Sequence, residues 1–178
     1  IGRGALEALG VGIDLGERDV AARGNFCKVD ENGLIVDRRA GRLATPEAIK
    51  LARMLNEIRI DGAEVHIEPV KEHRFAMVIR GDGLSASVQN TDPLKDGLAP
   101  LKAQALDQAS EKAAGLINDY IDKARAVLKD EELANMILLR GFDRLPEVPK
   151  YGDLFGLKAA SIAVNGMYRG VSRLVGMQ

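Results

Sequence analysis

A tight-turn dipeptide, Asn32-Gly33, constrains this chain more than any other local feature. Asparagine followed by glycine readily adopts the positive φ angles that a two-residue hairpin turn requires. The runs on either side, 21–29 and 34–37, are rich enough in Val, Ile and Phe to form paired strands. The sequence therefore predicts a β-hairpin whose two arms lie side by side.

Arginines accompany the predicted hairpin, one on the first arm and three just after the second. They are Arg23, Arg38, Arg39 and Arg42. A guanidinium group is a planar, permanently charged donor that matches phosphate and carboxylate oxygens. The cluster predicts an anion site near one end of the ribbon. The alternative is that these arginines are exposed and form only weak ion pairs with Asp19, Asp30 and Asp37.

The overall charge balance leaves room only for local anion recognition. The 178 residues carry a net charge of −1, which argues against a surface that coats nucleic acid or binds broadly to membranes. Cys27 is the only cysteine; it excludes an intrachain disulfide, fits a buried apolar position and favours a reducing compartment, the cytoplasm. No apolar run approaches the roughly 20 residues of a membrane helix, and no signal peptide is visible. The ends of the sequence suggest a piece of something longer.

Hydrophobic periodicity predicts the other elements. The expected helices are a short one at 6–9, one starting at Pro46 with Thr45 as its cap, a long one at 101–128, a short one from Glu131, and two in the tail at 151–157 and 167–176. The expected strands are 34–39, 63–70, 73–80, the apolar run 136–139 as a central strand, and 160–164. This order predicts an α/β (α+β) fold in which a mixed, mainly antiparallel βαββαβ sheet has helices on one face, with a β-hairpin and a C-terminal α/β flank. The expected division is a flank at 1–18, a domain at 19–145 and the start of another domain at 146–178.

Complete catalytic machinery is hard to assemble from these residues. The two histidines, His66 and His73, lie on separate predicted strands without the spacing of metal ligands. No serine lies in a nucleophile-elbow setting. His73 and Arg74 stand beside a predicted turn, where they could contact an anion, and the polar loop at 81–100 could add ligand contacts. The residue chemistry indicates a binding or cap domain rather than a whole enzyme.

Several longer runs occur in the same order as in a known enzyme family. They are Arg3-Gly4-Ala5-Leu6-Glu7-Ala8-Leu9-Gly10, Arg23-Gly24-Asn25-Phe26, Asp37-Arg38-Arg39-Ala40-Gly41-Arg42, His73-Arg74, Thr91-Asp92-Pro93 and Ile137-Leu138-Leu139-Arg140-Gly141. On these runs the chain resembles the archaeal-type cofactor-independent (2,3-bisphosphoglycerate-independent) phosphoglycerate mutases of the alkaline phosphatase superfamily. The same family includes members labelled phosphonopyruvate decarboxylase-like.

The resemblance implies a glycolytic isomerase that interconverts 3-phosphoglycerate and 2-phosphoglycerate through a phosphoserine, with two divalent metal ions, manganese or magnesium. In that family the serine and the metal ligands lie before and after the region matched here. No catalytic residue, metal ligand or bound cofactor is therefore expected in this chain. It would be the inserted cap domain with short flanks, and its partner would be the catalytic domain of the same polypeptide, with no nucleic acid or membrane involved.

The resemblance also implies which side chains would hold the phosphate and carboxylate of phosphoglycerate. They are Arg23, Asn25, Arg38, Arg39, Arg42, His73 and Arg74. The loop departs from the Ser-Asp-Thr-Asp-Pro of many relatives, because it reads Gln89-Asn90-Thr91-Asp92-Pro93 and has one carboxylate fewer. The competing hypothesis is a non-enzymatic module whose arginines contact an anion or a partner protein.

Overall fold

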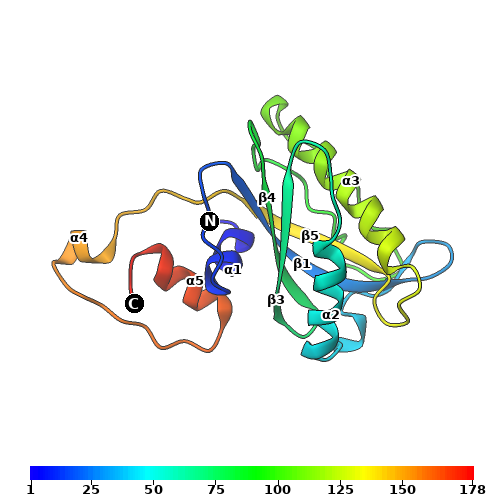
Figure 1. Cartoon of the computed structure of the whole chain (residues 1–178), viewed down its shortest axis with the longest axis horizontal. Helices are drawn as coiled ribbons and strands as arrows, with labels where there is room; N and C mark the ends of the chain where they lie inside the picture. Colours follow the sequence, from blue (N-terminus) through cyan, green and yellow to red (C-terminus); the bar gives the residue numbers. More distant parts are fainter.

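One antiparallel sheet organises the molecule, in a computed structural model that describes all residues, 1–178. The long strand β1 (Asp19–Val29) lies between β4 (Arg74–Arg80) and β5 (Met136–Asp143). β3 (Glu64–Lys71) pairs with the outer side of β4, and the short β2 (Ile35–Asp37) pairs with the end of β1. Every pairing is antiparallel, so the sheet contains none of the parallel pairs that a mixed sheet would have (Figure 1).

Helices pack on both faces of this sheet, and only α4 lies well away from it (Figure 1). They are α1 (Arg3–Gly10), α2 (Thr45–Asn56), α3 (Glu111–Leu128), α4 (Tyr151–Phe155) and α5 (Gly166–Leu174), with 3-10 turns at Ala40–Arg42 and Gln108–Ser110. As expected, α2 and α3 cover one face, whereas α1 packs on the opposite face and α5 packs on α1 (Figure 1). None of the helices combines the length and the hydrophobicity needed to cross a bilayer.

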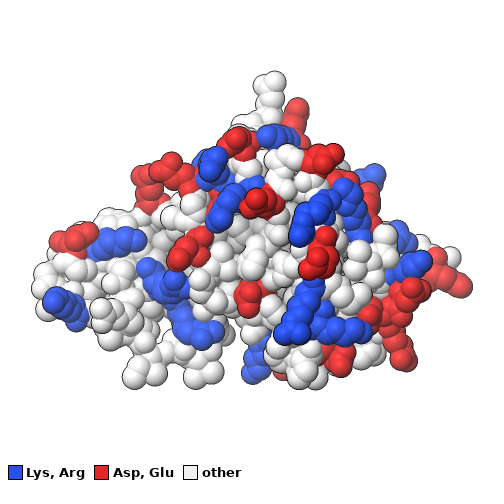
Figure 2. Space-filling model, in the orientation of Figure 1, with Lys and Arg blue, Asp and Glu red and all other residues white.

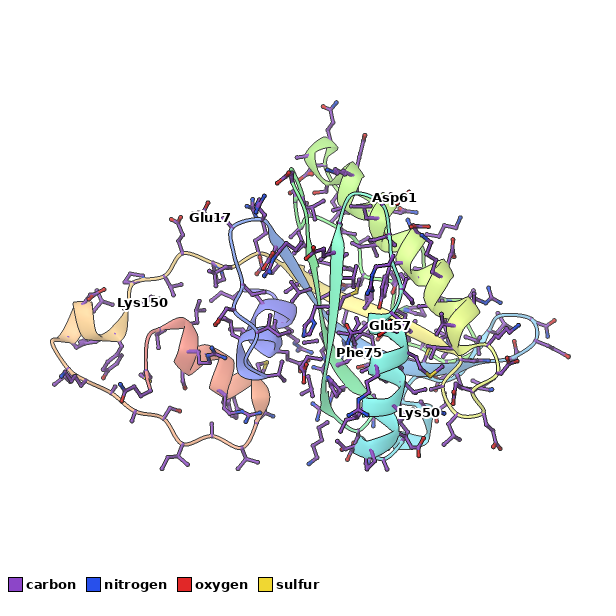
Figure 3. The ribbon with its side chains drawn as sticks, viewed as in Figure 1. Glu17, Lys50, Glu57, Asp61, Phe75 and Lys150 are labelled. Carbon is purple, nitrogen blue, oxygen red and sulfur yellow. The ribbon has the colours of Figure 1, made fainter.

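The main core fills the space between the sheet and the helices α2 and α3. Phe26 and Phe75 pack there with ring centroids 4.8 Å apart and ring planes tilted by 49°, and Figure 3 shows Phe75 among the strands of the sheet. Gly24 must be a glycine, because a Cβ at this position would lie 2.0 Å from the ring of Phe75. The Tyr120 hydroxyl, fully buried in α3, donates a hydrogen bond of 3.0 Å to the Leu55 carbonyl of α2.

A smaller apolar cluster joins the two ends of the chain. It contains residues of α1, the far face of β1 and β4, and Leu174 of α5. A Cβ at Gly170 would lie 1.8 Å from the Leu6 carbonyl oxygen, and a Cβ at Gly10 would lie 1.8 Å from that of Gly166. Glycine therefore lets the backbones of α1 and α5 approach closely, and the two flanks lie side by side (Figure 1).

The hairpin and the edge strand were predicted correctly. β1 and β2 are joined through Gly33, whose φ is 78°, although the strand expected at 34–39 is reduced to β2. β3 lies at the edge of the sheet, as Pro69 suggested. The Asn56 side chain closes this edge, because it accepts from the Ile67 N–H at 2.8 Å and donates to the Ile67 carbonyl at 2.9 Å.

The helix expected at 101–128 begins only at Glu111, so its first ten residues were predicted wrongly. The segment before it pairs with the irregular loop that follows β4. The Gln89 N–H donates to Gln104 and the Leu106 N–H donates to Ser87, both at 2.8 Å. The Asn118 side chain also bonds both backbone groups of Ala103. These tertiary contacts outweigh the weak intrinsic preference for helix.

Three further element predictions were wrong at the level of detail. Ala44, not Thr45, is the N-cap of α2, and the Thr45 hydroxyl instead accepts from the Glu72 N–H at 3.4 Å. No helix starts at Glu131, because this residue lies in a turn and its carboxylate binds Lys50 at 3.0 Å. No strand forms at 160–164, where Ile162 and Val164 are exposed and no neighbouring strand lies alongside.

The apolar run 136–139 does form a strand, but β5 lies at an edge instead of the centre and continues through Asp143. Its outer side is covered by the loop. The Thr91 N–H donates to the Leu139 carbonyl, and the Leu139 N–H donates to the Thr91 hydroxyl, both at 2.8 Å. This pairing buries β5 on its edge and explains its continuous apolar sequence.

Candidate anion-binding site

The site lies on the sheet face that carries α1, at the end that α1 leaves uncovered. Alternate side chains of a strand point to the same face, so Ala21, Arg23 and Asn25 share this one. Ala21 is buried against α1. The register places Arg23 directly beside Arg140 of β5, and Asn25 directly beside Arg74 of β4. Polar side chains from three strands therefore form a continuous floor.

This floor opens into a hollow of about 430 Å³ with no hydrophobic residue in its lining. The lining residues are Arg23, Asn25, Arg38, Arg39, Arg42, Glu72, His73, Arg74 and Arg140. The structure thus brings together every side chain that the sequence singled out for anion binding. On the face shown in Figure 2, basic and acidic side chains lie among uncharged ones and neither sign covers the face. With six arginines in its lining, the pocket is a local concentration of positive charge in a chain whose net charge is −1.

Behind the floor of the pocket lies a buried carboxylate that was not predicted. Arg23 and Arg140 are cross-strand neighbours, and like charges in this position repel each other. Glu7 of α1, only 2% exposed, places its Oε1 3.5 Å from Nη1 of Arg23. Burial raises the pKa of the Glu7 carboxyl above its ordinary value, although the nearby Arg23 charge acts in the opposite direction. Burial also disfavours the charged forms of Arg23 and Arg140, and it lowers the pKa of both.

A second buried carboxylate, Asp92 of the long loop, holds Arg38 from behind. Both Asp92 oxygens accept from the Arg38 guanidinium at 3.0 Å, and the Arg38 Nη1 also donates to the Leu94 carbonyl. Arg140 approaches the same carboxylate at 3.6 Å. Burial alone would raise the pKa of Asp92, but the hydrogen bonds from Arg38 and the Leu94 N–H lower it overall. The Arg38 guanidinium is thus already engaged within the protein.

A strained turn presents two further arginines at the rim. Residues 40, 41 and 42 have φ angles of 47°, 62° and 54°, a left-handed conformation that non-glycine residues rarely adopt. The Asp37 carboxylate stabilises the turn, because it accepts from the N–H groups of Arg39 at 2.7 Å and Gly41 at 2.6 Å. The exposed Arg39 and Arg42 are held over the pocket in this way and form no ion pair.

The alternative that the hairpin arginines merely pair with nearby acids is wrong. Asp19 binds Arg80 through two contacts of 2.7 Å. Asp30 accepts backbone N–H groups of the hairpin turn, and Asp37 holds the strained turn just described. None of these three carboxylates forms an ion pair with an arginine of the pocket.

Unsatisfied polar atoms gather at this site. Six buried side-chain nitrogen or oxygen atoms have no hydrogen-bond partner in the whole chain. Five of them belong to the pocket or to the carboxylate behind it: Glu7 Oε2, Arg23 Nε, Asn25 Oδ1, His73 Nδ1 and Arg140 Nε. Since buried polar atoms in proteins are nearly always bonded, this concentration indicates a place for a polar ligand.

His73 contributes a neutral ring to the pocket. Burial and the adjacent Arg74 charge lower the pKa of His73 to about 4. The imidazole is uncharged at neutral pH and can therefore accept or donate a hydrogen bond through its unpaired Nδ1.

The residues of this chain do not fit a metal centre. No group of three or more His, Cys, Asp or Glu side chains lies close enough together to hold an ion. The two buried carboxylates behind the pocket, Glu7 and Asp92, face arginines. Cys27 is buried, and burial raises the pKa of its thiol, so it is a core residue as the sequence suggested.

The sequence interpretation missed two lining residues, Glu72 and Arg140, and the carboxylate behind the pocket, Glu7. Arg140 follows the apolar run 136–139 and Glu7 lies in a mostly apolar helix, which is the only sequence signal that either residue carries. Alternation along β5 could have placed Arg140 only if its register with β1 had been known.

Comparison with known proteins gives a consistent result. The family model described as 2,3-bisphosphoglycerate-independent phosphoglycerate mutase matches residues 1–134. Two curated relatives, each named as a probable 2,3-bisphosphoglycerate-independent phosphoglycerate mutase, come from Thermosipho melanesiensis and Thermus thermophilus. They are 46% and 49% identical to this chain. Each alignment covers the whole of this chain and 44% of the relative.

Two solved structures share the fold. The cofactor-independent phosphoglycerate mutase from Thermoplasma acidophilum has a TM-score of 0.79 and 31% identity, with 99% of this chain and 50% of that chain covered. The PH0037 protein from Pyrococcus horikoshii has a TM-score of 0.72 at 21% identity, with 99% of this chain and 42% of that chain covered.

The sequence given thus spans less than half the length of the curated relatives that it matches. The family match nevertheless extends over 134 of its 178 residues and includes most of the arginine pocket. The chain belongs to the 2,3-bisphosphoglycerate-independent phosphoglycerate mutase family.

Proposed function

We propose that this chain is the substrate-holding part of a phosphoglycerate mutase, and that its pocket binds the phosphate and carboxylate of phosphoglycerate. The observation that carries the proposal is the convergence of six arginines with buried, unpaired hydrogen-bonding atoms in one hollow. Arginine can bind both phosphate and carboxylate through two parallel hydrogen bonds. A ligand that carries both a phosphate and a carboxylate can form hydrogen bonds with more of these arginines than a ligand that carries only one of the two groups.

The charge balance of the pocket supports a multiply charged ligand. Arg23 and Arg38 each face a buried carboxylate, and Arg140 shares the one bound to Arg38. Arg39, Arg42 and Arg74 have no such partner in the chain. A phosphate ester carries roughly 1.5 to 2 negative charges at neutral pH, and a carboxylate adds another. Phosphoglycerate would therefore neutralise these three arginines.

In this proposal the chain binds and orients the substrate while other segments of the polypeptide perform the chemistry. The family implies an isomerase of glycolysis that uses a phosphoserine and two divalent ions, manganese or magnesium. Neither a nucleophile setting nor a metal-ligand set is available among the residues of this chain. We therefore expect no turnover by this chain alone, and we expect its partner to be the catalytic domain in the cytoplasm.

The proposed division assigns 19–145 to the substrate-binding cap and 1–18 and 146–178 to flanks of the catalytic part. The packing of α1 against α5 supports it, because the segments that enter and leave the sheet domain lie together. The contact of Glu7 in α1 with Arg23 in β1 links the flank to the cap.

Calorimetric titration with 3-phosphoglycerate tests the proposed function. We expect saturable binding that weakens about tenfold in Arg39→Ala and in Arg74→Ala, because each substitution removes a charge-assisted hydrogen bond worth roughly 1.5 kcal/mol. These two arginines form no ion pair, so the fold should be retained.

Arg53→Ala, on the exposed side of α2, is the matched control and should bind like the wild type. An equal loss in all three variants would mean a nonspecific charge effect. A folded wild-type chain without saturable binding would count against substrate binding and would favour an interaction module for an acidic protein.

A further inference from the structure

The buried carboxylate behind the pocket differs from the other buried carboxylates of this chain. Asp19 binds Arg80 with two contacts of 2.7 Å, and Asp92 binds Arg38 with two of 3.0 Å. Glu7 makes a single approach of 3.5 Å to Arg23, and its second oxygen has no partner. Buried carboxylates normally require complete pairing. The Glu7 contact is thus a loose ion pair that leaves donors of Arg23 free.

The surroundings of Glu7 are otherwise cationic. The charged groups that act on it are Arg3 of its own helix, Arg23 of β1, Arg74 of β4 and Arg140 of β5. Two of these, Arg23 and Arg140, are direct cross-strand neighbours on the pocket floor. Without Glu7 the floor of the empty pocket would contain two adjacent half-buried arginines, and only Arg140 would approach another carboxylate, at 3.6 Å.

We propose that Glu7 is the internal counter-ion of the pocket: it stabilises the empty site and competes with a bound anion for Arg23. This proposal rests on the proposed function, because it assumes that the pocket takes an anion. The Glu7 carboxylate compensates the cations while the site is empty, and repels a phosphate or carboxylate that enters. Glu7 therefore lowers the affinity of the pocket and allows the arginine cluster to fold without a ligand.

Glu7→Gln tests the proposal, since the amide keeps the shape of the side chain and removes its charge. We expect the variant without ligand to melt several degrees below the wild type. We expect its affinity for 3-phosphoglycerate to rise roughly fivefold, as removal of a partly screened like charge near the ligand predicts. Inorganic phosphate should raise the melting temperature of the variant more than that of the wild type, because the ligand replaces the missing charge.

Asp19→Asn is the matched control, because it also removes a buried carboxylate from an arginine but lies outside the pocket. It should lower the melting temperature and leave the affinity for 3-phosphoglycerate unchanged. If Glu7→Gln behaves in the same way, Glu7 is only a structural residue and the proposal is wrong. Weaker binding by Glu7→Gln would also overturn it, since Glu7 would then hold Arg23 in its binding position.

The two proposals can fail separately. A wild type that does not bind 3-phosphoglycerate contradicts the proposed function. In that case the melting temperatures of the wild type and Glu7→Gln, each measured with and without inorganic phosphate, still test the role of Glu7. Equal stabilisation of wild type and Glu7→Gln by phosphate, or stabilisation of neither, would contradict the counter-ion proposal.

Discussion

Arg38 and Arg39 are adjacent in the chain, yet their guanidinium groups have different surroundings. Arg38 is bound by the Asp92 carboxylate and the Leu94 carbonyl, whereas Arg39 is exposed and forms no ion pair. Both were predicted to bind substrate on the same sequence run. The structure suggests different contributions: Arg38 ties the long loop to the pocket, while Arg39 is free to meet a ligand.

Asp92→Asn should destabilise the protein in a pH-dependent manner. Loss of the charge leaves Arg38 and Arg140 without their shared carboxylate, and we expect a loss of roughly 2 kcal/mol at pH 7. Because the pKa of Asp92 is lowered in the folded state, its contribution is present above the ordinary value of 3.8 and disappears as the pH falls through the lowered pKa. Urea denaturation of both proteins between pH 7 and pH 3 measures the difference.

The stability difference between wild type and Asp92→Asn should therefore shrink below about pH 4. A difference that stays constant down to pH 3 would show that the carboxylate charge does not stabilise the fold. Asp82→Asn, which removes an exposed partner of Arg18, serves as the control and should change stability little at any pH.

At the scale of elements, local patterns predicted well those segments whose partners lie nearby. The hairpin at Asn32-Gly33 and the stripe of α2 depend on neighbouring residues, and both were predicted at the correct position, although only Gly33 of the turn has a positive φ. The segment 101–107 has a helical composition but is irregular, because the loop after β4 and Asn118 supply its hydrogen bonds. The strand expected at 160–164 failed for the opposite reason, since no strand is available to pair with it.

At the edge of β3, the side chain of Asn56 makes the backbone hydrogen bonds that a neighbouring strand would otherwise make, and this role can be tested. Asn56 satisfies both backbone groups of Ile67. Asn56→Asp should lose the hydrogen bond to the carbonyl and place a negative charge beside it, at a cost of roughly 1–3 kcal/mol. Thermal and chemical denaturation measure this loss.

Asn32→Asp is a control of the same chemical type, because aspartate is also accepted in this exposed hairpin turn. It should change stability by less than about 0.5 kcal/mol. Equal effects of the two substitutions would mean that the contact of Asn56 with Ile67 contributes nothing specific.

At the scale of the whole molecule, the sequence predicted which residues meet but not how they meet. Seven candidate residues from three regions line one pocket. They could be predicted together because the family runs that carry them pointed to one role. Arg140 and Glu7 were missed because their positions depend on strand register and on helix packing across the sheet. Neither property can be read from local periodicity.

The crossing of α1 and α5 should be sensitive to a single methyl group. Gly170→Ala would place a Cβ 1.8 Å from the Leu6 carbonyl oxygen, so α5 must move away from α1. We expect the C-terminal segment to detach and become protease-sensitive while the sheet remains folded, since the main core lies on the other face. Limited proteolysis with mass spectrometry, together with circular dichroism, measures both effects.

Gly115→Ala in α3 is the matched control, because a Cβ there meets nothing within 4 Å. It should stabilise the chain by up to about 1 kcal/mol, because alanine favours helix over glycine. Unchanged protease resistance in Gly170→Ala would show that the two helices tolerate separation or that the contact is not tight.

The floor of the pocket has a consequence for the order of assembly. Its side chains come from β1, β4 and β5, which are distant in the chain and are brought together only when the strands are in register. A partly folded intermediate would carry the same guanidinium groups dispersed along the polymer, with weak attraction for small anions. Occupancy of the hollow would thus report completed folding, and slowed amide exchange throughout the central strands would mark the ligated protein.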